Sequence, residues 1–167
     1  METLQRTANR GSVSTGYDID NSLKLEDDNT ENLYRALNGS TSTTKFTVSM
    51  WFKRSEFGAS QLLYMRGVAG NESVFLRTST EVNDALQVDI GASSTNSRSY
   101  TNALLRDTSA WYHVVLAVDT TQSTDTNRFK LYLNGNLITD FASRNNPAED
   151  FAMEVSSAKH RHGAYND

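Results

Sequence analysis

The stretch AWYHVVLAVD, residues 110–119, decides the fold, because it reads as one long extended strand. Successive side chains of a strand point to opposite faces of a sheet. One face would carry Trp111, His113, Val115 and Ala117, and the other Tyr112, Val114, Leu116 and Val118. Both sets are largely apolar, so we expect a central strand that is covered on both sides. The open question is whether His113 is catalytic or a polar group held within the sheet.

Short runs of alternating apolar and polar residues occur on both sides of this stretch. They lie at residues 22–26, 31–37, 45–54, 60–67, 73–79, 85–91, 99–105 and 127–134. Asn134-Gly135 suits a tight two-residue turn, so residues 127–134 should pair with residues 136–141. Because no amphipathic helix of useful length separates the runs, the fold class is all-β, an antiparallel β-sandwich.

Composition limits the classes of protein to consider. The 167 residues suffice for one domain, and we expect an attachment arm at residues 1–21 and a sandwich at residues 22–167. The absence of cysteine excludes disulfides, cysteine-bound zinc and thiol nucleophiles. A net charge of −4 without a basic stripe argues against nucleic-acid binding. Apolar runs are too short to span a membrane, so no membrane insertion is expected.

The sequence contains few residues in the patterns that known catalytic sites require. A general base needs a nucleophile or carboxylate partner, and no motif near His113 supplies one, so we expect this histidine to find a structural partner. Retaining glycosidases need two carboxyl groups about 5 Å apart. The acidic clusters instead fall in turns: Glu26, Asp27, Asp28 and Glu31, then Glu149, Asp150 and Glu154. We therefore expect no enzyme, with a glycoside hydrolase as the distant alternative.

Three sets of residues are candidates for binding. Asp119, Asp125 and Asn127 flank a polar loop whose oxygen atoms suit calcium, the one candidate cofactor. Trp51 and Tyr100 are candidates for stacking on sugars, although a large aromatic such as Trp51 is more often part of a core. The histidines of His160-Arg161-His162 lack cysteine or carboxylate companions, so a terminal strand or tail is expected there rather than a metal site.

Three segments in this order resemble a known family: FTVSMWFKRS at 46–55, SAWYHVVLAVDTT at 109–121 and NRFKLYLNGNLI at 127–138. The order is similar to that of concanavalin A-like jelly-roll domains of the laminin G-like and pentraxin-like kind. The opening RTANRGSVSTGYDIDNSLKLEDDNTENLYRAL resembles the start of virion and tail-fibre proteins of marine bacteriophages. The likeness covers residues 9 to 163, and it implies a framework role for His113.

The resemblance implies a non-enzymatic structural module of a phage virion, in a tail, fibre or capsid appendage, that is assembled in the host cytoplasm. Its partners would be other virion proteins, further copies of itself as a homo-oligomer, and host surface glycans. Glycan-binding adhesion as the main role is the alternative to assembly. Domains of this kind continue past a region like HRHGAYND with a closing strand, so the sandwich is expected to lack its last strand within this chain.

Overall fold

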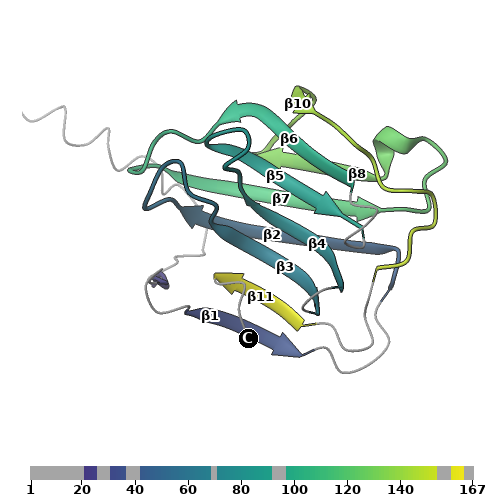
Figure 1. The fold of residues 1–167 in the computed structure, drawn as a ribbon, viewed down its shortest axis with the longest axis horizontal. Coiled ribbons are helices and arrows are strands. Elements are labelled where there is room, and N and C mark those ends of the chain that lie inside the picture. Colours follow the sequence, from purple (N-terminus) through teal and green to yellow (C-terminus); the bar gives the residue numbers. More distant parts are fainter. Residues whose placement is uncertain are drawn as a thin grey trace, which may run out of the picture.

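The computed structural model describes residues 21–25, 31–36, 42–68, 71–91, 97–153 and 159–163, which form two antiparallel β-sheets packed face to face (Figure 1). The strands are β1 (Asn32–Ala36), β2 (Lys45–Lys53), β3 (Leu62–Val68), β4 (Asn71–Thr78), β5 (Ala85–Ile90), β6 (Ser97–Leu104), β7 (Trp111–Asp119), β8 (Phe129–Leu133), β9 (Asn136–Leu137), β10 (Phe141–Ser143) and β11 (Lys159–Gly163). A 3-10 turn, η2 (Asp125–Asn127), precedes β8. Within these residues no helix is long and apolar enough to cross a membrane.

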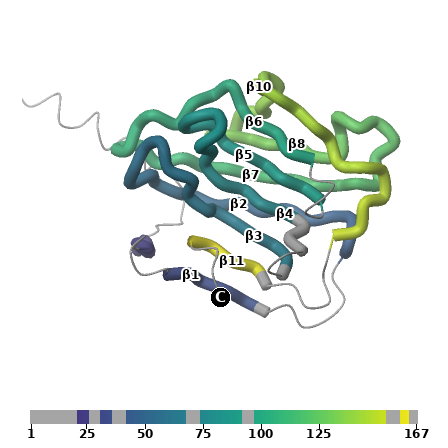
Figure 2. Tube along the Cα trace, viewed as in Figure 1, coloured from purple at the N-terminus to yellow at the C-terminus, as the bar shows by residue number. Residues whose placement is uncertain are grey.

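The larger sheet has seven strands in the order β1-β11-β3-β4-β5-β6-β10. Strands β3 to β6 follow one another as antiparallel neighbours. The chain path in Figure 2 brings β11 beside β1, although the two strands lie at opposite ends of the sequence. Strand β11 pairs with β3 on its other side, which makes it an interior strand of the sheet.

The smaller sheet has the order β2-β7-β8-β9. Strand β2 pairs with β7 over nine residues without a bulge, from Lys45 opposite Asp119 to Lys53 opposite Trp111. The predicted turn is confirmed: Asn134 and Gly135 have φ of 51° and 81°, and β8 pairs with β9 across them. Strand β9 is shorter than predicted, because the chain leaves this sheet and pairs β10 with β6 of the other.

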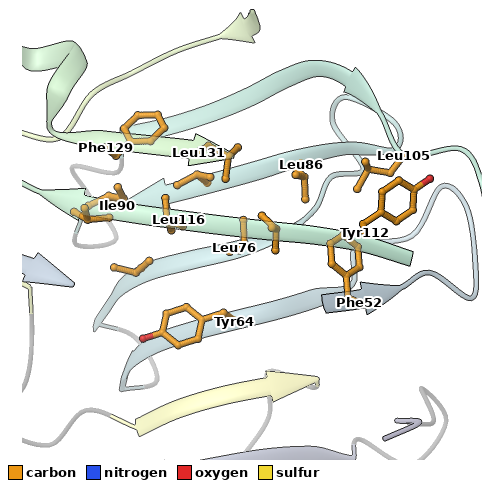
Figure 3. Packing of buried hydrophobic residues seen from close by; sticks show 14 of the residues in the cluster. Phe52, Tyr64, Leu76, Leu86, Ile90, Leu105, Tyr112, Leu116, Phe129 and Leu131 are labelled. Atoms are coloured by element: carbon orange, nitrogen blue, oxygen red, sulfur yellow. The ribbon is translucent and has the colours of Figure 1, made fainter. Parts of the chain in front are cut away.

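The core lies between the two sheets and is built from alternate residues of each strand. Figure 3 shows the inward aromatic and aliphatic side chains of both layers meeting there. They include Phe52, Tyr64, Leu76, Leu86, Ile90, Leu105, Tyr112, Leu116, Phe129 and Leu131. Residues 46, 48, 50 and 52 of β2 share the inward face, as their alternation predicted. The all-β sandwich prediction is therefore confirmed.

A buried ion pair fastens one end of the sandwich. Nη1 of Arg54, just after β2, lies 3.0 Å from Oδ1 of Asp84 and donates to the Leu105 carbonyl at 2.6 Å. The Asp84 carboxylate also accepts from the Gly58 backbone N–H at 3.1 Å and approaches Nε of Arg106 at 3.4 Å. The side chain of Arg54 is fully buried and that of Asp84 is 10% exposed. Three chain segments thus meet at one carboxylate.

The structure bears on two predictions about the ends of the chain. The segment after which a further strand was expected itself forms β11, an interior strand of the larger sheet, and residues 164–167 lie outside the described residues, so the expectation of a missing last strand stays a prediction. The predicted arm at residues 1–21 lies outside the described residues, except for Asn21. Residues 22–25 were expected to begin a strand, but they have no regular secondary structure.

Candidate functional site

The outer face of the four-stranded sheet exposes large aromatic side chains, including both tryptophans. Alternation along β2, β7 and β8 sends every second residue away from the core. We call this surface the tryptophan face: Thr47, Ser49, Trp51, Lys53, Trp111, His113, Val115, Ala117, Lys130, Tyr132 and Leu137. Trp51 and Trp111 are the only tryptophans of the protein, and they are 57% and 49% exposed.

The prediction that Trp51 packs inside the sandwich is wrong. Its neighbours Met50 and Phe52 face the core, so strand alternation places its indole on the opposite side. The indole stacks on the imidazole of His113, with ring centroids 4.9 Å apart and planes inclined by 23°. Strand β7 is central in its sheet, as predicted, but it is buried on one face only, since Trp111 is half exposed.

His113 has the structural partners that the sequence analysis expected. Its Nε2 lies 2.9 Å from Oγ of Ser49 on the neighbouring strand. Its backbone N–H donates to Oδ1 of Asn134 at 2.8 Å, and its carbonyl accepts from the Asn134 N–H at 2.8 Å. Ser49 escaped the sequence analysis because the contact depends on the register between β2 and β7, which the sequence does not reveal.

A serine within reach of a histidine is the first contact of a nucleophile and its base. Such a pair also needs a third group that orients the imidazole and donors for an oxyanion. Among the described residues, no carboxylate hydrogen bonds to Nδ1 of His113. The imidazole is instead held by the indole of Trp51. The hydrogen bond to Ser49 and the stacking contact therefore hold the imidazole of His113 and the indole of Trp51 in a fixed orientation.

A shallow hollow of about 470 Å³ opens at the other end of the same sheet. Its lining residues are Lys45, Phe46, Thr47, Ala117, Val118, Asp119, Gln122, Asn127 and Lys130. Asp119 accepts hydrogen bonds from the side chains of Thr121, at 2.6 Å, and Gln122, at 2.8 Å, and it pairs with Lys45 at 3.2 Å. The hydrogen bonds from Thr121 and then Gln122 lower the pKa of this carboxyl group far below its usual range.

The loop offers calcium few free oxygen atoms. Both carboxylate oxygens of Asp119 already accept hydrogen bonds from within the protein. Asp125 accepts from the Thr126 N–H at 2.6 Å and from Nδ2 of Asn146 at 3.2 Å. Asn127 lines the hollow together with Asp119, whereas Asp125 does not. The predicted calcium set is thus near in space, but two of its three members are engaged elsewhere.

Tyr100 lies on β6 of the other sheet, away from the tryptophan face. It is only 8% exposed, so its ring has no free face for a sugar. Its hydroxyl donates to Glu81, which also pairs with Arg98 at 2.8 Å. Burial and this hydrogen bond raise the pKa of the Tyr100 hydroxyl. Tyr100 belongs to a charged network on the outward side of the seven-stranded sheet.

The acidic residues of that network are tied to arginines. Asp89 is nearly buried and lies 3.3 Å from Nη2 of Arg77 and 3.1 Å from Nε of Arg98. It also accepts from Nε2 of Gln87 at 2.8 Å. Both carboxylate oxygens of Asp89 therefore already accept hydrogen bonds from side chains of the protein.

The remaining candidates from the sequence do not form a site. In the described parts of the chain, no three histidine or acidic side chains cluster as a metal would require. His160 and His162 are hydrogen bonded to the Tyr64 hydroxyl at 3.0 Å and to the Leu63 carbonyl at 2.8 Å. Glu149 pairs with Arg128 at 3.0 Å. Residues 26–28 and 154 lie outside the described residues.

A search of curated proteins found no match. A laminin G-type family model, described as the concanavalin A-like lectin/glucanases superfamily, matches residues 20–163, which is most of the chain. This description covers lectins as well as glucanases, in agreement with the antiparallel sandwich. The chain belongs to the concanavalin A-like lectin/glucanases superfamily.

Proposed function

We propose that this chain is a glycan-binding module without catalytic activity, and that its binding surface is the tryptophan face. The observation that carries the proposal is that both tryptophans are exposed on the same face of one sheet, in diagonal positions on the paired strands β2 and β7. The superfamily includes lectins, which makes a carbohydrate the natural ligand to consider. Function must still be argued from the site, because one fold hosts many functions.

The chemistry of this face suits a sugar. Pyranose rings carry C–H groups on one side that pack against an aromatic ring, and tryptophan offers the largest such ring. The contact between Trp51 and His113 orients one indole before any ligand arrives. A platform that is already ordered loses less side-chain entropy on binding. Ser49, Lys53 and Tyr132 supply polar groups around the platform.

The absence of catalysis is part of the proposal and has its own support. Asp89 and Glu81, acidic groups on the larger sheet, are engaged by arginines. The Ser49–His113 contact lacks a described carboxylate partner on the imidazole. A glycosidase on this fold would need one carboxyl group free to donate a proton and another free to attack.

A glycan array with the purified protein tests the proposal, run once with calcium and once with chelator. We expect binding that survives chelation, and a loss of about tenfold in affinity for Trp51→Ala, which corresponds to about 1.4 kcal/mol. Trp51→Phe should retain part of the affinity, because a smaller ring still stacks. Tyr34→Ala removes an exposed aromatic residue from β1 of the other sheet and is the matched control.

Two results would contradict the proposal. Folded protein that binds no glycan would remove the lectin role. Hydrolysis of a bound glycan that Ser49→Ala abolishes would show an enzyme instead.

We also propose, from the likeness of residues 6–37 to virion protein openings, that the module works on a phage particle with further copies of itself. Many copies would raise a weak affinity per site through avidity. The arm would contact other virion proteins. Antibodies against the chain should then label purified particles, and particles that lack the chain would refute this setting while leaving glycan binding intact.

A further inference from the structure

The tryptophan face and the hollow form one continuous surface. Thr47, Ala117 and Lys130 belong to both. Trp51 lies four residues along β2 from Thr47, which at about 3.3 Å per residue is a distance of ~13 Å. Lys130 lies two strands across from β2, at about 4.8 Å per strand, so its backbone is ~16 Å from that of Trp51. A ligand that reaches both places must be longer than one sugar ring.

The hollow contains polar side chains that no described residue engages. Among the described residues, the side chains of Lys130 and Asn127 have no hydrogen bond or ion pair, and both line the hollow. The Lys45 ammonium lies beside them and is paired with Asp119. A cation with a neighbouring amide suits a ligand that carries a negative charge among hydroxyl groups.

The charge of the whole surface also favours an anionic ligand. The chain has a net charge of −4, yet this surface carries Lys45, Lys53 and Lys130 against the single carboxylate of Asp119. A local excess of positive charge on an acidic protein favours an anionic ligand over a neutral one.

We propose that the hollow is a second subsite for an acidic group of an extended glycan, with Lys130 as its cation, while another sugar of the same chain stacks on Trp51. This inference rests on the proposed function and specifies its ligand class: an internal stretch of a polysaccharide that bears carboxylate or sulfate groups. Because the hollow is shallow and open, the polysaccharide can continue past either end of it. The acidic group lies about two strands and four residues from the stacked ring.

The two tryptophans provide the assay. Since both lie on this surface, the whole tryptophan emission reports on it. We would titrate the protein with galacturonic acid oligomers, sulfated galactose oligomers and neutral galactose oligomers of two to eight sugars. The carboxylated and sulfated series distinguish the two sources of charge. We expect affinity to rise with length until both subsites are filled, and acidic oligomers to bind more tightly than neutral ones of equal length.

Variants separate the subsite from the platform. Lys130→Gln should weaken acidic oligomers by about twofold to fivefold, the range for an exposed ion pair, and leave neutral oligomers unchanged. Lys24→Gln, an exposed lysine outside the four-stranded sheet, is the matched control and should have no effect. Added salt should weaken acidic oligomers only.

The outcomes are distinct. If neutral and acidic oligomers bind equally, or if Lys130→Gln behaves like Lys24→Gln, the acidic subsite is wrong while a Trp51-dependent lectin stands. If no oligomer of any series binds folded protein, the subsite proposal is wrong, and the glycan array decides separately whether the proposed function fails as well.

Discussion

Replacing Asp84 by Asn tests whether the buried ion pair holds one end of the sandwich. Asn has the same shape as Asp, tolerates the left-handed backbone at this position, where φ is 69°, and can still accept the Gly58 N–H. The substitution therefore removes the charge and little else. It leaves the Arg54 guanidinium fully buried without its counter-ion.

The magnitude follows from the contact. At 3.0 Å and an effective dielectric constant of about 20, the attraction between the two charges is roughly 5–6 kcal/mol. The remaining hydrogen bonds of Asn recover part of this, about 1–1.5 kcal/mol each. We expect a loss of about 3 kcal/mol in the free energy of unfolding, at the lower end of values for broken buried pairs. For a chain of this length, the melting temperature should fall by about 6–12 °C.

Urea unfolding at pH 7, followed by tryptophan emission, measures this loss. Asp140→Asn, an exposed Asp on the loop before β10, is the control and should change stability by less than about 0.5 kcal/mol. Arg54→Met added to Asp84→Asn should recover stability, because it removes the orphaned charge.

Acid provides a second readout of the same carboxylate. The Gly58 N–H and the Arg54 guanidinium lower the pKa of Asp84 below its usual value. A lowered folded-state pKa contributes stability above the unfolded value, near pH 4, and this stability is lost as the pH falls through the folded-state pKa. The wild type should therefore lose more stability below pH 4 than Asp84→Asn does. A loss under about 1 kcal/mol at pH 7, or a double variant no better than the single one, would refute the reasoning.

Two further predictions concern the strands around β11. Gly163→Ala should cost more stability than Gly135→Ala, although both glycines have positive φ, because a Cβ at 163 would lie 2.7 Å from the Glu31 carbonyl oxygen while the space at 135 is open. We expect urea unfolding to show a loss of about 2–3 kcal/mol for Gly163→Ala and about 1 kcal/mol for Gly135→Ala. Equal losses would contradict this account. Burial, and then the nearby charge of Arg66, lowers the pKa of His160, so the unfolded chain takes up the proton first and stability falls as the pH is lowered below about 6.5. His160→Gln should flatten the change in urea midpoint between pH 7.5 and 5.5, and an unchanged slope would show that His160 is not its cause.

Much of the fold could be predicted because alternation is a local property of the sequence. The range predicted for β7 agrees with the strand, and β2 to β6 begin within two residues of the predicted positions. The hairpin at Asn134-Gly135 followed from the demand for positive φ at both turn residues. What alternation does not contain is the choice of partner, so neither the entry of β11 between β1 and β3 nor the transfer of β10 to the other sheet was foreseen.

The candidate site was predicted less well, and for a similar reason. Alternation separated Trp51 from the inward residues of β2, but it did not say which faces a second layer would cover. The expectation that a large aromatic residue is buried then gave the wrong environment for Trp51. Tyr100, a candidate for stacking on sugars, is instead 8% exposed, and its hydroxyl donates to Glu81. The contact between Ser49 and His113 needs the pairing register of two strands that are far apart in sequence.

The interior position of β11 has a consequence for how the chain acquires its structure. Strand β1 is made early during synthesis, but its described strand partner is made more than a hundred residues later. Until the ribosome has released β11, β1 lacks the strand partner that the structure describes, and the edge of β3 that β11 will cover stays open. Such long-range pairing slows folding, because a large loop must close before any contact compensates for its lost entropy. We therefore expect the hairpins from β3 to β6 to assemble first, and the β1–β11 pair to join them in the last and slowest step.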